Sequence, residues 1–142
     1  MVARRQVQPL QDNTNPNNVS IGNANLKQEF TNRFSLNVND YKVLSGRWLY
    51  MWGSFSMIDN SITRSESIDS LGKRTYQYIN VDGNYNGYMG GGIGKRITKL
   101  NSRIGGSFSA SVNRTNNLVN GVKNVSDFNR YSAGLNGGYE TK

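Results

Sequence analysis

Histidine and cysteine, the side chains that most often serve as general base, nucleophile or transition-metal ligand, are both absent from this chain. The acidic residues are few and scattered, and no carboxylate pair has the spacing of an acid–base couple or a calcium loop. We therefore expect that the protein is not an enzyme, and that it has no catalytic residue, no metal site and no cofactor.

The segment Gly90–Arg96 is the remaining candidate for chemistry, because its glycines and Lys95 are similar to a phosphate-binding loop. That loop requires glycine where Met89 stands and Ser or Thr where Arg96 stands. The segment also lies inside a strand pattern and not before a helix. A glycine-rich strand that accommodates curvature or large neighbouring aromatic side chains is the better interpretation.

Apolar and polar residues alternate with a period of two in several segments, which places each set on one face of a strand. One face is apolar, and the other is built from Asn, Ser and Gly, which suits a wall between lipid and a water-filled lumen. We assign to the lipid Ile104, Phe108, Ala110, Val112, Tyr131, Ala133, Leu135 and Tyr139. The candidate lumen-facing residues are Asp82, Asn84, Asn86, Arg103, Ser107, Ser109 and Asn136, with Ser111 and Glu140 also on that side.

The pattern predicts an all-β fold of antiparallel up-and-down strands that form part of a transmembrane β-barrel. Residues 1–142 are expected to be one partial barrel domain of five to six strands. Short connectors alternate with long polar loops, as in outer-membrane barrels. The predicted strands cover residues 29–40, 47–57, 76–95, 102–113 and 128 to the end; the short connectors are 41–46 and 96–101, the long loops are 58–74 and 114–127, and residues 1–26 are irregular.

Two segments leave alternatives open. In residues 47–57 both parities are apolar, so the lipid side stays unassigned, although an interfacial aromatic belt would explain Trp48, Tyr50 and Trp52. In residues 76–95, Asp82-Gly83 is a hairpin signal. Because the parity continues through it, we predict one long strand.

The net charge of +8 is compatible with nucleic-acid binding, but the basic residues are scattered and are not interleaved with stacking aromatics. Their two clusters, Lys42 with Arg47 and Lys95, Arg96, Lys99 with Arg103, flank short connectors. A solvated turn or a rim against anionic lipid headgroups explains both. No apolar run reaches the ~18 residues of a membrane helix, and the first residues do not form a signal peptide, so we expect an internal fragment of a larger barrel.

The segment Gly22–Phe30 resembles the G-N-P-N-L-K-P-E motif of TonB-dependent outer-membrane receptors. The matching positions are Gly22, Asn23, Asn25, Leu26, Lys27 and Glu29, while Ala24 and Gln28 stand where that family usually has proline. The resemblance implies a segment that leads from an extracellular loop into a descending barrel strand. The plug domain, TonB-contacting segment and C-terminal aromatic strand of that family have no counterpart here.

This resemblance implies a section of a barrel in the outer membrane of a Gram-negative cell, which imports an unidentified nutrient too large for porins. Its partners would be outer-membrane lipid, the remainder of the barrel and a plug domain, and no nucleic acid. The alternative is a soluble or surface-attached structural or adhesive β-sheet protein. Detergent dependence separates the two hypotheses.

Overall fold

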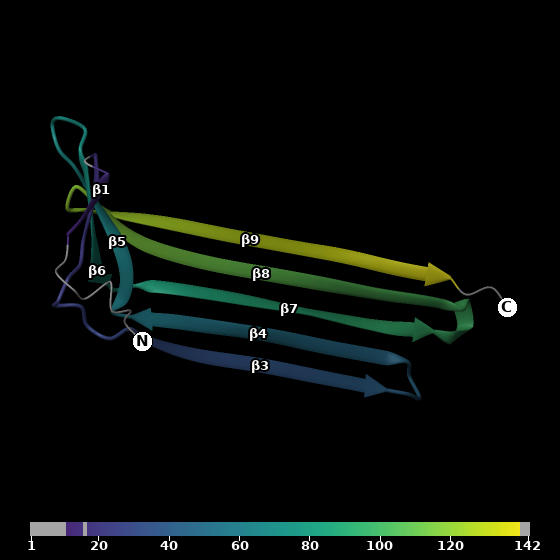
Figure 1. Cartoon of the computed structure of the whole chain (residues 1–142). Coiled ribbons are helices and arrows are strands. Elements are labelled where there is room, and N and C mark those ends of the chain that lie inside the picture. The colour runs from purple at the N-terminus through teal and green to yellow at the C-terminus, as the bar shows by residue number, and fades with distance from the viewer. Residues whose placement is uncertain (1–10, 16, 140–142) are drawn as a thin grey trace. The chain divides into compact units, whose positions relative to one another are not determined.

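The chain folds almost entirely into β-strands. The computed structural model describes residues 11–15 and 17–139 (Figure 1). Its elements are β1 (Gln11–Asn15), β2 (Asn18–Ile21), β3 (Phe30–Lys42), β4 (Arg47–Asp59), β5 (Ser61–Ile68), β6 (Arg74–Val81), β7 (Asn84–Ile97), the 3-10 helix η1 (Thr98–Leu100), β8 (Ser102–Val119) and β9 (Val122–Tyr139). The all-β expectation is confirmed. No helix in the described part of the chain is long and apolar enough to cross a membrane.

Strands β3, β4 and the first half of β8 lie where the period-of-two pattern predicts them. The predicted loop 58–74 is wrong, because it contains β5 and the first residue of β6, which pair antiparallel from Ser61↔Val81 to Ile68↔Arg74. The predicted single strand 76–95 is also wrong. The chain breaks at Asp82-Gly83, where Gly83 adopts a φ of 90° that a side chain would strain.

The predicted long loop 114–127 is a hairpin, since β8 and β9 extend to a two-residue turn at Asn120-Gly121 with φ values of 51° and 74°. Positive φ at both central residues is the type I′ geometry that Asn-Gly favours. The alternation of short connectors and long loops is therefore wrong. Polar strands that continue past the apolar segment carry no period-of-two signal, which is why the pattern missed them.

The N-terminal segment, predicted to be irregular, contains β1 and β2 within its described part, and residues 1–10 and 16 lie outside the described residues. The described chain holds nine strands in place of the five or six expected. Glu140 also lies outside the described residues.

The chain divides into two compact units. Unit 1 holds residues up to Asn32, Met57–Tyr85 and Arg114–Asp127; unit 2 holds Arg33–Ser56, Asn86–Asn113 and the residues from Phe128 onward. In unit 1 the strand order is β1-β2-β6-β5, with β2 parallel to β6 and with β5 meeting β8 at Glu66↔Val119. In unit 2 the order is β3-β4-β7-β8-β9, and neighbouring strands run antiparallel (Figure 1).

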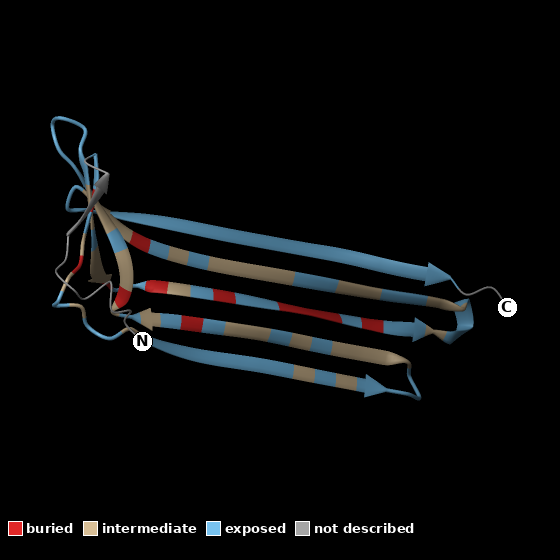
Figure 2. Ribbon diagram, viewed as in Figure 1, coloured by how far each residue is buried: buried red, intermediate tan, exposed pale blue. Residues whose placement is uncertain are grey.

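Burial is slight throughout the described side chains. The buried hydrophobic residues are Val19 and Val81, both in unit 1. In unit 2 the buried positions concentrate on the central strand β7, and the outer strand β9 is exposed along its whole length (Figure 2). Large apolar side chains are left open, such as Phe34 at 64% and Leu135 at 94% exposure. A single sheet layer with exposed apolar side chains is expected for the wall of a membrane barrel. A soluble protein would bury these side chains in a core.

Candidate functional site

The predicted turn motif is a connector in unit 1 that runs from β2 to β3. The Asn23 side-chain oxygen accepts a hydrogen bond from the Asn25 backbone N–H at 2.9 Å, which forms an Asx-turn. The Asn23 amide nitrogen donates to the Tyr78 carbonyl on β6 at 2.9 Å. Gly22 is buried and Leu26 is half-buried. The first half of the motif thus forms its own turn and attaches it to the β5–β6 hairpin.

The second half of the motif is held by Asn80, a β6 residue that sequence reasoning did not single out. The Lys27 backbone N–H donates to the Asn80 side-chain oxygen at 2.7 Å. The Asn80 amide nitrogen donates in return to the carbonyls of Lys27 at 3.0 Å and Asn60 at 2.7 Å. No local pattern identifies this residue, because its partner in the motif is 53 positions away.

Glu29 completes the attachment of the motif. Its carboxylate accepts the Ile62 backbone N–H on β5 at 2.9 Å, where a charge-assisted bond is stronger than a neutral one. The motif residues therefore meet one another through Asn80 and the β5–β6 hairpin, and each polar contact is to backbone or to an amide side chain. This arrangement fixes the entry of β3 and presents no group for chemistry.

Unit 2 has two chemically distinct faces. A Cβ built on Gly87 would lie 2.7 Å from the Phe55 ring and 3.3 Å from Val112, so these residues share one face. Ser109 and Ser132 share a hydrogen bond of 2.8 Å between hydroxyls on the opposite face. We call the first the apolar face; it carries Phe34, Leu36, Val38, Leu49, Met51, Phe55, Met89, Ile93, Ile104, Phe108, Ala110, Val112, Tyr131, Ala133, Leu135 and Tyr139.

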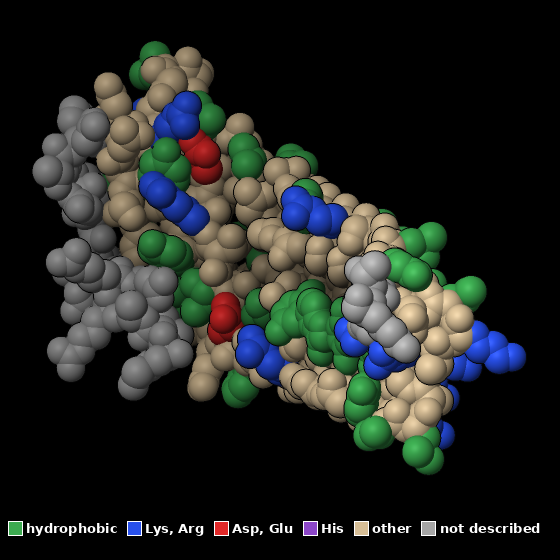
Figure 3. All heavy atoms as spheres, turned by 90° about the vertical axis from the view of Figure 1, so that its right-hand side faces the viewer, with side chains coloured by type: hydrophobic (Ala, Val, Ile, Leu, Met, Phe, Trp, Pro, Cys, Tyr) green, Lys and Arg blue, Asp and Glu red, His purple; other side chains and the backbone are tan. Residues whose placement is uncertain are grey.

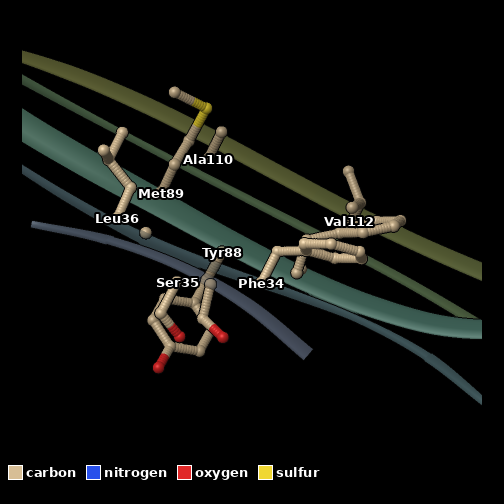
Figure 4. A pocket seen from close by; sticks show the side chains of 11 residues that line it. Phe34, Ser35, Leu36, Tyr88, Met89, Ala110 and Val112 are labelled. Carbon is tan, nitrogen blue, oxygen red and sulfur yellow. The ribbon is translucent and has the colours of Figure 1, made fainter. Parts of the chain in front are cut away.

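The opposite surface, which we call the polar face, is rich in Ser, Asn and Gly. Its members include Ser35, Asn37, Ser54, Asn86, Tyr88, Arg103, Ser107, Ser109, Ser111, Ser132 and Asn136. Figure 4 shows the separation around a groove of about 310 Å³: Leu36, Met89 and Ala110 point to one side, while Ser35 and Tyr88 point to the other.

The predicted site residues divide between the two units. Asn86, Arg103, Ser107, Ser109 and Asn136 lie on the polar face of unit 2, spread along its strands. Asp82 and Asn84 belong to unit 1 and lie at the break between β6 and β7. All eight residues assigned to lipid in the two C-terminal strands share the apolar face.

Asp82 and Asn84 make hydrogen bonds that hold neighbouring backbone segments together. The Asp82 carboxylate accepts the Asn60 backbone N–H at 2.8 Å, and the Asp82 carbonyl accepts the Asn116 side-chain amide at 2.9 Å. Asn84 is buried, and its side-chain oxygen accepts the Asn116 backbone N–H at 2.7 Å. These contacts replace the ladder bonds that the strand break interrupts.

The structure resolves the parity of residues 47–57. Leu49, Met51 and Phe55 lie on the apolar face, and Trp48, Tyr50 and Trp52 lie on the polar face over the glycines of β7. A Cβ on Gly90, Gly92 or Gly94 would lie 2.7, 2.9 or 2.4 Å from the opposite aromatic ring. The glycine-rich segment thus makes room for large aromatic neighbours, as the sequence indicated, and the three rings do not join an aromatic belt on the apolar face.

The hairpin of β8 and β9 carries a paired charge in unit 1. Arg114 donates two hydrogen bonds to the Asp127 carboxylate, at 2.6 and 2.7 Å, and its guanidinium lies 5.4 Å from the centre of the Tyr85 ring. The hydrogen bond and the positive charge of Arg114 lower the pKa of Asp127 below its ordinary value. Both residues lie beyond the apolar segments Ile104–Val112 and Tyr131–Tyr139 of their strands.

Comparison with known protein families gives a match over nearly the whole chain. A family model described as an outer membrane protein beta-barrel family matches residues 3–141. The searches of curated proteins and of solved structures returned no match.

Proposed function

The chain belongs to the outer membrane protein β-barrel family, which lies in the Gram-negative outer membrane, and we propose that unit 2 is a section of barrel wall whose apolar face meets lipid and whose polar face lines the lumen. One observation carries this assignment. On β8 and β9 the apolar face runs unbroken over nine-residue segments, Ile104–Val112 and Tyr131–Tyr139.

The length of these apolar segments fits a bilayer. A tilted spanning strand needs about 9–11 residues, and the lipid-facing band of a barrel is about 25 Å tall. Ser102 and Arg114 flank the apolar segment of β8 on the same face, so the polarity changes at both ends of the band. A soluble sheet would instead cover such a face with a second layer, which none of the described residues provides.

At a finer level, we propose that the parent barrel is a TonB-dependent-receptor-like importer of a large ligand. The turn motif supports this proposal, because Asn23, Lys27 and Glu29 together attach the connector between β2 and β3 to the β5–β6 hairpin. In unit 2, β3 and β9 are the outer strands, and the remainder of a barrel would pair with both. A plug domain would face the Ser- and Asn-rich polar face. The proposed role of the chain is that of a wall, without catalysis, metal, cofactor or nucleic acid.

A pair of arginine substitutions tests the wall assignment. Phe108→Arg should destabilise the assembled barrel in lipid vesicles by roughly 2–4 kcal/mol, because the charge would lie on the lipid face near the midplane. Ser109→Arg places the same charge on the opposite face, where it loses a hydroxyl hydrogen bond of about 1 kcal/mol. Unfolding in denaturant measures both variants. A larger loss for Ser109→Arg would invert the assignment of the two faces.

A further inference from the structure

A groove on the apolar face runs toward the end of unit 2 that carries the β3–β4 and β7–β8 connectors. Its volume is about 620 Å³, and its lining includes Ile93, Ile104, Gly106, Leu135 and Gly137. A neighbouring groove of about 530 Å³ shares Ile93, Gly106 and Leu135 and continues past Phe108. A Cβ on Gly137 would come no closer than 3.8 Å to another residue, so the floor of the groove is open.

Two cations, Arg47 and Lys95, complete the lining of this groove. The Arg96 backbone N–H donates to the Gly46 carbonyl at 3.1 Å, and Trp48 lies beside Gly94. This register brings Arg47 directly opposite Lys95 on one face. Like charges in that position repel each other and destabilise the strand pair unless an anion lies near both.

The protein neutralises only part of this charge. Asp40 on β3 lies 2.5 Å from an Arg47 guanidinium nitrogen. Lys95, which is exposed, makes no ion pair with any described residue. The groove therefore ends in two cations, one paired with Asp40 and one, the exposed Lys95 ammonium, open to a ligand, and this end is continuous with the apolar lining.

We propose that this groove binds an anionic phospholipid, with the phosphate between Arg47 and Lys95 and one acyl chain along Gly106, Gly137 and Leu135. The proposal rests on the assignment of the apolar face to lipid. A phosphodiester with net negative charge complements the paired cations, whereas a zwitterionic headgroup brings its own ammonium. Lys and Arg side chains gather beside hydrophobic ones at this end (Figure 3). Lys42 and Lys99 belong to the strand end and connector here and add to the local positive potential, as do Arg96 and Arg103 on the polar face.

The test measures lipid retention by native mass spectrometry of the full chain in neutral detergent micelles. Phosphatidylglycerol and phosphatidylcholine with identical acyl chains are titrated separately. The wild-type chain should hold phosphatidylglycerol about fivefold more tightly. Lys95→Gln should remove most of this preference. Lys99→Gln removes the same charge at the same end but outside the groove, so it should keep the preference.

Two further measurements distinguish binding in this groove from general electrostatic attraction of anionic lipid, and from a purely structural role of Lys95. Gly137→Val should weaken retention of both lipids, because its side chain would fill the open trough. Lys95→Gln should also raise the thermal midpoint in lipid-free micelles, since the repulsion with Arg47 is relieved. Equal retention of the two lipids by the wild-type chain, or an undiminished preference in Lys95→Gln, overturns the proposal while the wall assignment stands. A chain that takes up no detergent and stays monomeric in buffer would instead overturn the proposed function.

Discussion

At the scale of single residues, the glycines of β7 determine which large side chains the neighbouring strand can carry. Gly94→Val should destabilise the folded chain in detergent by about 1–3 kcal/mol, because a Cβ there would lie 2.4 Å from the Trp48 indole and the ring would have to move. Denaturant unfolding followed by tryptophan fluorescence measures this loss. Gly138→Val is the control, since nothing lies within 4 Å of a Cβ at that position of β9. An equal change in stability at the two positions would show that the ring contact does not govern the cost at Gly94.

Asn80 is the second residue whose role is local and measurable. Asn80→Ala should cost about 1–3 kcal/mol, because it removes the side-chain bonds to Lys27 and Asn60 at once. The Lys27 amide should exchange with solvent faster, whereas amides in the middle of β8 should not change. Asn39→Ala is the matched control, since within the described residues the Asn39 side chain bonds only to Asn37, on the exposed surface of β3. Unchanged protection at Lys27 would contradict the assigned role of Asn80.

At the scale of elements, the tip of the β8–β9 hairpin should respond to acid. Arg114 lowers the pKa of Asp127 below its ordinary value of 3.8, so the pair adds stability that is present above that value and is lost as the pH falls through the lowered pKa. The residues around Asn120-Gly121 should therefore lose amide protection as the pH falls below the ordinary carboxyl value of 3.8. Asp127→Asn should remove this pH dependence and leave the tip less protected at pH 6. A tip that loses no protection in acid would show that the turn and its hydrogen bonds to Glu66 and Ile68 hold it without the ion pair.

The individual strands show how much of the fold could be predicted from the sequence. Strands β3 and β4 and the apolar segment of β8 were predictable, because burial of one face imposes a period of two. Strand β5 was missed because it carries polar side chains on both faces, as in Arg64, Ser65 and Glu66, whereas most of β6 lay inside the predicted strand 76–95. The break at Gly83 has a local signal in Asp82-Gly83, which continuing parity outweighed, while the hydrogen bond between Asn84 and Asn116 beside the break spans 32 positions. Local propensity contains no information on such a pair.

At the scale of the whole chain, the exposed apolar face and the unpaired outer strands of unit 2 act together. Without detergent the chain should associate, because apolar side chains such as Leu135 are exposed and the edges of β3 and β9 can pair with further copies. Sedimentation velocity in plain buffer should show oligomers, and neutral detergent above its critical concentration should return one species. The double variant Phe108→Ser, Leu135→Ser should reduce the association, whereas Ser107→Thr on the polar face should not. A monodisperse monomer in buffer with a cooperative melt would instead support the soluble or adhesive β-sheet protein, since such a monomer must bury this face within its own fold.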